Sequence, residues 1–130
     1  MSLAAAPKPY LIVDFDKPGS PLGPHETRCD YLFIAEGEGD VGLVAPLELK
    51  RGSLHAREVA GQLQAGASAA EKLVPPDEPI ELRPVAASSG RSKAERTRLK
   101  AKGNRIRLHG RLEAVRLMSC GAPLVEALRP

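Results

Sequence analysis

A helix-spaced run of small and apolar residues, set between strand-like segments, constrains the fold of this chain more than any other feature. Apolar side chains recur every three or four residues up to the Pro75-Pro76 stop, which indicates one helix face turned toward a core. These positions are Ala56, Val59, Ala60, Leu63, Ala67, Ala70 and Leu73. Ser53 stands where an N-cap is expected, and Gly61 and Gly66 are small enough to permit close packing on a sheet. The pattern predicts a helix over residues 53–73 that packs against strands.

Strand-like segments precede and follow this helix, each bounded by turns that contain glycine or proline. They cover residues 10–15, 28–35, 41–50, 80–86, 105–108 and 112–118, the last two joined at His109-Gly110. The turn at residues 36–40 favours an antiparallel hairpin, and Pro84 favours a sheet edge or an irregular strand end. A short polar helix is expected over residues 93–102, with Gly103 as its C-cap, and a helical turn over 123–128. We therefore expect an α/β fold with a mixed β-sheet flanked by helices.

The length of the chain favours one domain. A chain of 130 residues is long enough for a single hydrophobic core and too short for two. We expect one domain over residues 1–130, with a core over residues 10–86 and a basic extension of helix and hairpin over residues 91–130. Two tyrosines, two phenylalanines and no tryptophan offer few rings for base stacking, so nucleic acid would be bound mainly by charge.

Cysteine spacing and hydropathy indicate in which cellular compartment the protein is expected. Cys29 and Cys120 lie far apart and the three histidines are scattered, so neither a zinc cluster nor a disulfide framework is indicated. No apolar run approaches the roughly 20 residues of a membrane span, and the first residues lack the charged and apolar regions of a signal peptide. We expect a protein of the reducing cytoplasm with no membrane partner.

The acid-x-lysine pair Glu48-x-Lys50 lies in one of the predicted strands. With 16 acidic residues and 7 lysines in the chain, about one such spacing is expected by chance, so its meaning depends on context. Side chains alternate along a strand, so Glu48 and Lys50 share one face while Leu47 and Leu49 occupy the other. Asp30 opens the preceding strand. On neighbouring strands, two carboxylates and an ammonium group converge on one spot.

The net charge of +3 conceals a strong asymmetry along the chain. Residues 1–90 hold 8 basic and 13 acidic side chains, whereas residues 91–116 hold 10 basic side chains against Glu95 and Glu113, a net charge of +8. A dense basic segment beside an acidic pocket suits a metal-dependent nuclease, because one part attracts phosphates and the other holds cations. The side chains expected to contact nucleic acid are Arg91, Lys93, Arg96, Arg98, Lys100, Lys102, Arg105 and Arg107. The alternative is a solvated basic helix and hairpin.

The order of elements resembles the PD-(D/E)XK nuclease superfamily, whose fold is restriction-endonuclease-like. A hairpin carries an acid on one strand and Glu-x-Lys on the next, and a helix and a further strand follow; the similarity covers residues 10–86. The resemblance implies that Asp30 and Glu48 ligate Mg²⁺ or Mn²⁺, with the backbone carbonyl of Leu49 as a further ligand. It also implies that Lys50 positions or activates the attacking water. Beside two carboxylates Lys50 stays protonated, which favours a role in steadying transition-state charge.

Gln62-Leu63 on the predicted helix resembles the glutamine-leucine of the RecB-like branch, which implies that Gln62 points toward the active site as a catalytic residue. Gly66 stands where that branch has a tyrosine. Many members of the superfamily carry a further acidic ligand on a helix before the first strand, whereas here a strand and a proline-rich loop precede Asp30. The candidates to replace that ligand are Glu26, Asp14 and Asp16.

These features predict a magnesium-dependent nuclease that hydrolyses phosphodiester bonds of nucleic acid, with DNA favoured, by attack of water on phosphorus. One alternative is a catalytically inactive module of the same fold that binds nucleic acid or a protein partner. Another is a structural interaction protein whose basic segment packs against the acidic half of a second copy in a homodimer. The positions of the Asp30 and Glu48 carboxylates test this metal site. If they lie more than about 8 Å apart, or on opposite faces of the sheet, they cannot share an ion.

Overall fold

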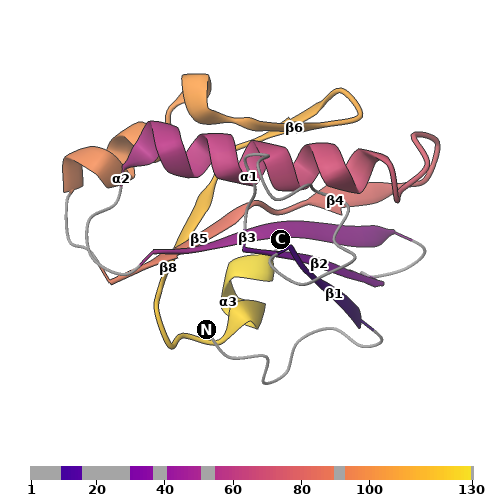
Figure 1. Ribbon diagram of the computed structural model, residues 1–130, viewed down its shortest axis with the longest axis horizontal. Coiled ribbons are helices and arrows are strands. Elements are labelled where there is room, and N and C mark those ends of the chain that lie inside the picture. The colour runs from indigo at the N-terminus through magenta and orange to yellow at the C-terminus, as the bar shows by residue number, and fades with distance from the viewer. Residues whose placement is uncertain (1–9, 16–29, 37–40, 51–54, 90–92, 130) are drawn as a thin grey trace.

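The computed structural model describes residues 10–15, 30–36, 41–50, 55–89 and 93–129. The strands are β1 (Tyr10–Asp14), β2 (Tyr31–Glu36), β3 (Gly42–Lys50), β4 (Ile80–Leu82), β5 (Val85–Ser88), β6 (Ile106–Leu108), β7 (Arg111–Glu113) and β8 (Arg116–Ser119). The helices are α1 (Ala56–Glu71), α2 (Lys93–Leu99) and α3 (Leu124–Leu128), with a 3₁₀ turn, η1, at Lys102–Asn104. They form one small mixed α/β domain, as the sequence predicts (Figure 1).

The main sheet is mixed and follows the order β1-β2-β3-β5-β8, with β4 also paired to β3. β1, β2 and β3 are antiparallel neighbours, which confirms the predicted hairpin of β2 and β3. β4 and β5 run parallel to β3, and β8 runs parallel to β5. The carboxyl ends of the parallel strands therefore lie together at the edge of the molecule where α1 and α2 begin, on the left in Figure 1.

Pro84 divides one predicted strand into β4 and β5. Proline has no N–H for the ladder, but the Pro84 carbonyl accepts a hydrogen bond from the Arg116 N–H at 2.8 Å. The Arg83 N–H donates to the Val44 carbonyl at 2.9 Å and keeps both short strands on β3. The irregular strand is confirmed, whereas a sheet edge at Pro84 is wrong because β5 lies between β3 and β8 and is buried.

α1 is capped by a distant part of the chain. Its N-cap residue is His55, whose side chain makes no capping hydrogen bond. The Glu95 carboxylate of α2 instead accepts a hydrogen bond from the Ala56 N–H at 2.9 Å. The first N–H groups of a helix have no partner within the helix, and here a tertiary contact supplies one. The predicted N-cap at Ser53 is therefore wrong, and Ser53 itself lies outside the described residues.

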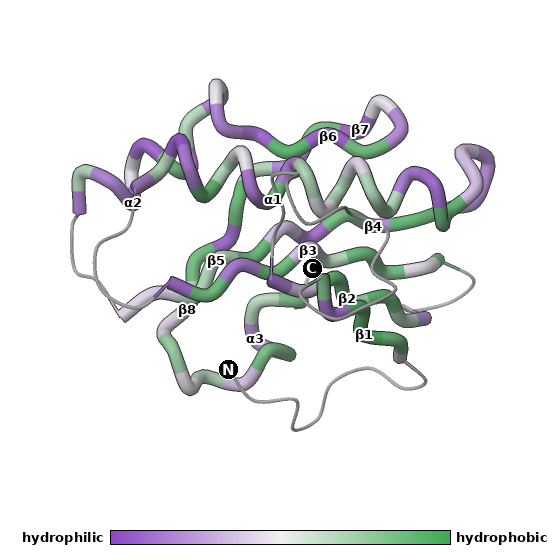
Figure 2. The backbone as a smooth tube through the Cα atoms, viewed as in Figure 1, coloured by the Kyte–Doolittle hydropathy of each residue, from purple (hydrophilic) through white to green (hydrophobic). Residues whose placement is uncertain are grey.

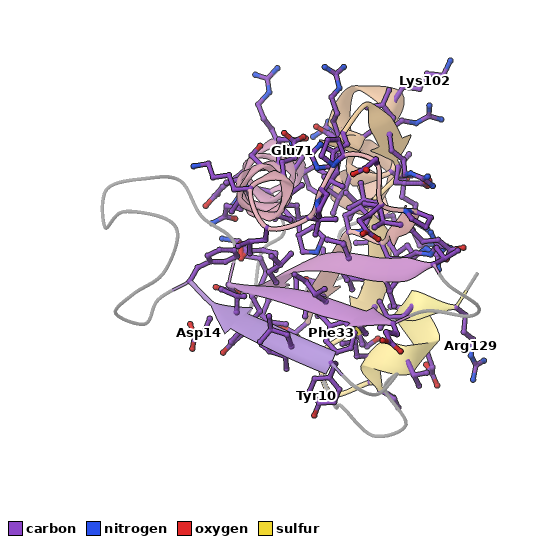
Figure 3. All side chains as sticks on the ribbon, turned by 90° about the vertical axis from the view of Figure 1, so that its right-hand side faces the viewer. Tyr10, Asp14, Phe33, Glu71, Lys102 and Arg129 are labelled. Atoms are coloured by element: carbon purple, nitrogen blue, oxygen red, sulfur yellow. The ribbon has the colours of Figure 1, made fainter. Side chains whose placement is uncertain are left out.

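The main sheet separates two hydrophobic cores, and its central strands carry hydrophobic colours in Figure 2 while α2 is largely hydrophilic. The first core lies between the sheet and α1 and includes Leu32, Val44, Val59, Leu63 and Ala86. The second lies between the sheet and α3 and includes Phe33, Ala45, Leu47, Val85 and Leu124. On this second side the Tyr10 ring stacks on Phe33 with centroids 5.3 Å apart (Figure 3). Each strand therefore turns alternate residues toward α1 and toward α3.

The C-terminal segment adds structure on both sides of α1. β6 and β7 form a two-stranded sheet on the outer side of α1, joined at His109 and Gly110 with φ of 47° and 80° (Figure 1). Two successive positive φ values are those of a type I′ hairpin turn. β8 then joins the main sheet beside β5. The predicted single strand over residues 112–118 is thus two strands, and the main sheet takes a strand from beyond residues 10–86.

Hydrogen bonds from α1 hold this hairpin in place. The Gln64 side chain accepts from the Arg107 N–H and donates to the Arg107 carbonyl, both at 2.9 Å. Glu71 Oε1 accepts from the His109 N–H at 3.1 Å, and the His109 ring nitrogen lies 2.7 Å from the Val74 carbonyl. The hairpin is therefore fixed along α1 at two points.

The helix before the hairpin, α2, is shorter than the sequence predicts. α2 ends at Leu99, which is fully buried, and Gly103 lies inside η1 instead of capping a helix at residue 102.

None of the helices in the described part of the chain has the length and apolar character of a membrane span.

Candidate metal and nucleic-acid site

Asp30 and Glu48 meet at the end of the β2–β3 ladder. The register pairs Tyr31 with Leu47, so the next antiparallel pair sets Asp30 opposite Glu48. The Asp30 N–H donates to Glu48 Oε1 at 3.2 Å, and Asp30 Oδ2 accepts from the Leu49 N–H at 2.8 Å. Both side chains lie on the α1 face, because their alternate neighbours Leu32 and Val44 belong to the core beneath that helix. The two carboxylates therefore share one face and one end of the sheet.

Glu48 is a buried acid whose pKa is raised. Its residue is 2% exposed, and burial, followed by repulsion from Asp30 and a hydrogen bond with that side chain, raises the pKa of Glu48 to about 8. The Lys50 ammonium and the Asp30 N–H oppose this shift of the Glu48 pKa. Adjacent buried carboxyl groups resist being ionised together. A divalent cation between them would offset both the burial and the repulsion, so the pair fits such an ion.

The donor set suits magnesium. The Lys50 carbonyl accepts from the Ser89 N–H on the β5 side, whereas the Leu49 N–H donates to Asp30 on the β2 side. The N–H and C=O of one strand residue point toward the same neighbour, so the Leu49 carbonyl lies on the Asp30 side. Carboxylate and carbonyl oxygens are ligands that Mg²⁺ prefers, with waters completing its octahedron.

The number of side-chain ligands is small. Within the part of the chain that the structure describes, no group of three or more His, Cys, Asp or Glu side chains could hold a metal ion. Asp30 and Glu48 would therefore be the two side-chain ligands of an ion here, and the Leu49 carbonyl and water would supply the remaining ligands.

Lys50 connects this pair to α1. Its side chain shares the face of Glu48 and its charge lowers the pKa of that acid. Lys50 Nζ also forms an ion pair with Glu58 Oε1 at 3.3 Å, and the two side chains are 24% and 55% exposed. Lys50 thus lies between a buried carboxyl group and a surface carboxylate from the first turn of α1.

Gln62 lies one turn after Glu58 on α1, so both side chains share a face of the helix. The Gln62 Oε1 atom is buried and has no hydrogen-bond partner among the described residues. Since Glu58 on this face contacts Lys50, Gln62 lies on the side of α1 that carries the site. No direct contact links Gln62 to Asp30 or Glu48 among the hydrogen bonds of the described residues.

Of the three candidates for a further acidic ligand, Asp14 is the one that lies among the described residues. Asp14 pairs with Tyr31 on β2, and the residues that alternate with it, Val13 and Phe15, face the core under α1. Asp14 therefore lies on the face opposite to Asp30 and Glu48, and its candidacy as a ligand is wrong. Glu26 and Asp16 lie outside the described residues.

The predicted nucleic-acid contacts divide into two groups, with Arg91 outside the described residues. Lys93, Arg96 and Arg98 lie on α2, beside the start of α1 and near the carboxylate end of the sheet. Lys100, Lys102, Arg105 and Arg107 follow along the outer side of α1, all exposed, and Lys102 projects away from the sheet (Figure 3). Arg105 and Arg107 alternate with buried Ile106 and Leu108, as predicted. Only the α2 group therefore lies at the carboxylate end.

Two residues at the site were missed in the sequence. Glu58 pairs with Lys50, and Glu95 binds the first N–H of α1. The spacing of Glu58 and Gln62, four apart on one helix, is a signal that they share a face. No comparable signal links Glu95 to Ala56, because they are distant in the chain.

Comparisons of this chain with protein-family models, with curated proteins and with solved structures found no match.

Proposed function

We propose that this protein is a magnesium-dependent nuclease of the PD-(D/E)XK type that hydrolyses phosphodiester bonds of nucleic acid, with DNA as its expected substrate. The observation that carries the proposal is the carboxylate pair of half-buried Asp30 and buried Glu48 with Lys50 beside it. The raised pKa of Glu48 favours a site that gains from a divalent cation. The chain has two cysteines, which lie far apart in the sequence, and this agrees with a cytoplasmic setting.

The residues have separable roles in this proposal. Asp30 and Glu48 hold Mg²⁺ or Mn²⁺ as ionised carboxylates, and the Leu49 carbonyl adds a third oxygen. The ion, when bound, polarises the phosphate and lowers the pKa of its water. The Lys50 side chain, held by Glu58, stabilises the negative charge that grows on the phosphate oxygens.

The second candidate is a module that binds nucleic acid without cutting it. The specific observation in its favour is that Asp30 and Glu48 supply only two side-chain ligands within the described residues. The exposed basic side chains of α2 and the β6–β7 hairpin would suffice for such binding. A homodimer, in which the basic segment packs against the acidic half of a second copy, is the corresponding proposal for a structural protein.

A cleavage assay with matched variants separates these functions. The wild-type protein should nick supercoiled plasmid DNA in Mg²⁺ or Mn²⁺ and be inactive in EDTA. Glu48→Ala and Lys50→Ala should each lower the rate about 100-fold or more, as loss of a metal ligand or charge-stabilising group does. Glu36→Gln, at the exposed far end of β2, serves as the control and should cleave like wild type.

Salt-sensitive binding with no cleavage of single-stranded, duplex or RNA substrates would support the binding module instead. Unchanged mobility of all these nucleic acids at low salt would rule out both functions. Sedimentation of the protein as a salt-sensitive dimer without nucleic-acid binding would support the structural role.

A further inference from the structure

A groove lies between the start of α1, α2 and η1, and we call it the α1–α2 groove. It has a volume of about 790 Å³, and its walls include Arg57, Glu58, Glu95, Arg98 and Asn104. Sites for small ligands or ligand segments span about 300–1,000 Å³, so the groove has the size to hold one or two units of a polymer. The carboxylate pair Asp30–Glu48 lies outside the residues that line it.

The acids in this groove are already paired. Glu95 accepts hydrogen bonds from the Ala56 N–H at 2.9 Å and from Arg98 at 2.8 Å. The bond from Ala56 holds the pKa of Glu95 below its usual value, so this side chain is a carboxylate with two donors. Glu58 forms its ion pair with Lys50. With Glu58 paired to Lys50 and Glu95 to Arg98, an incoming anion meets the exposed Arg57 guanidinium and those N–H groups of Arg98 that Glu95 does not occupy.

The walls of the groove are held in place before any ligand arrives. The Asn104 side chain donates to the Arg98 carbonyl at 2.7 Å and ties η1 to α2. The Glu95 bond to Ala56 ties α2 to α1. Arg57 is exposed on the first turn of α1. The walls of the groove and Arg98, which Glu95 holds, are therefore in place before a negatively charged group binds.

The groove is continuous with the carboxylate site. Glu58 lines the groove and touches Lys50 at 3.3 Å, and Lys50 acts on the pKa of Glu48. An anion bound at Arg57 and Arg98 is thus separated from the carboxylate pair by one ion pair. A ligand that fills both places carries successive anionic groups, which is the chemistry of a nucleic-acid strand.

We propose that the α1–α2 groove binds a phosphodiester of the substrate strand next to the one that is cut, through Arg57 and Arg98. This inference rests on the proposed nuclease function and assigns Arg57, outside the dense basic segment, a direct contact with substrate. The groove sets where the strand lies, and the carboxylate pair carries out the chemistry. The same cations would attract free phosphate, so the test has to separate a strand from a single anion.

The test measures binding in a protein that cannot cut. Glu48→Gln protein in EDTA is titrated into a fluorescein-labelled single-stranded DNA oligonucleotide, and anisotropy is followed over a series of salt concentrations. Adding Arg57→Ala or Arg98→Ala should weaken binding about tenfold, the usual effect of losing a charged hydrogen bond. Each should also lower the slope of log affinity against log salt by about 0.7, the loss of one phosphate contact. Lys72→Ala, an exposed cation at the other end of α1, is the control and should have less effect.

Cleavage by the otherwise wild-type protein provides the second readout. Arg57→Ala should raise KM for DNA while Mg²⁺-dependent cleavage persists. If affinity, salt slope and KM are unchanged in both arginine variants, the groove does not bind the strand, even if the wild-type protein cuts DNA. Failure of the wild-type protein to cut would show instead in the plasmid assay and would overturn the proposed function and this subsite together. Displacement of the oligonucleotide by an equal concentration of inorganic phosphate would show a site for single anions and overturn the strand subsite.

Discussion

At the scale of single residues, Glu48 shows the conflict between stability and the proposed chemistry most clearly. A carboxyl group that is 2% exposed and adjacent to Asp30 is costly to ionise, and its raised pKa of about 8 expresses that cost. A neutral side chain of the same shape would avoid the cost. The acid at this position agrees with its proposed role as a metal ligand.

This cost predicts the pH dependence of stability without metal. The pKa of Glu48 is about 8 in the folded protein against an ordinary value of 4.5. Between these two pH values the folded protein keeps the proton on Glu48, whereas the unfolded chain has released it. The stabilising contribution is full below pH 4.5, falls by up to about 1.4 kcal/mol per pH unit through this window and is gone above pH 8. Glu48→Gln should remove this decline. Urea unfolding in EDTA from pH 5 to pH 9 measures it, and equal slopes for both proteins would contradict the assignment.

Glu58 is predicted to act through Lys50. Its ion pair is half exposed, so Glu58→Gln should change the free energy of unfolding by less than about 1 kcal/mol. The kcat of Mg²⁺-dependent cleavage should nevertheless fall, about tenfold, with KM little changed, because Lys50 loses the partner that holds its ammonium group in place. Glu78→Gln, an exposed acid beyond the end of α1, is the control. A kcat equal to that of wild type would exclude a positioning role for Glu58.

Some of these residues could be predicted from the sequence and others could not. Asp30 and Glu48 were predictable because alternation along two adjacent strands determines which side chains face each other. Asp14 fails for the same reason, since its position in β1 turns it to the other face. The Lys50–Glu58 ion pair and the Glu95 cap depend on how α1 and α2 pack, which no local pattern in the chain encodes.

At the scale of elements, α1 organises the molecule on both of its sides. Its inner face packs on the main sheet, and its outer face binds the β6–β7 hairpin through Gln64. The two bonds of Gln64 to the Arg107 backbone imitate the pairing of a neighbouring strand. A helix side chain thereby fixes where the basic side chains of β6 are displayed.

Gln64→Ala should release the hairpin from α1. The loss of two partly exposed hydrogen bonds should lower the free energy of unfolding by about 1 kcal/mol and raise amide exchange at Ile106 and Arg107. The Ser68 hydroxyl accepts only a long hydrogen bond from the same Gln64 side chain, at 3.3 Å, so Ser68→Ala is the control and should have little effect. Unchanged exchange in Gln64→Ala would show that packing of Ile106 and Leu108 holds the hairpin alone.

The elements that local patterns define were predicted well, including α1, β3 and the turn at His109-Gly110. Periodicity and turn chemistry are local properties. The predictions were wrong where contacts between distant chain segments determine the structure. β8 pairs with β5 instead of continuing the hairpin, and Pro84 lies inside the sheet instead of at its edge.

At the scale of the whole molecule, the acidic pair on the sheet and the basic side chains of α2 lie at the same end of the domain. Metal binding at the acidic pair should therefore stabilise the entire fold. An ion at 100 times its Kd adds about 2.7 kcal/mol to the free energy of unfolding. Mn²⁺ should raise the Tm of the wild-type protein and of Glu36→Gln, but not that of Asp30→Asn or Glu48→Gln. Equal shifts in all four proteins would place the ion elsewhere.

The cap that Glu95 provides to α1 has a consequence for how the protein matures during synthesis. The helix turn that carries Arg57 and Glu58 begins with the Ala56 N–H, whose partner is translated 39 residues later. Until the ribosome has delivered α2, that turn is left to fray, and β8, later still, is missing from the sheet. The first turn of α1 and Arg98 of α2, which lines the groove, would thus become ordered together. A chain that ends before α2 should lack the groove even where its carboxylate pair can form.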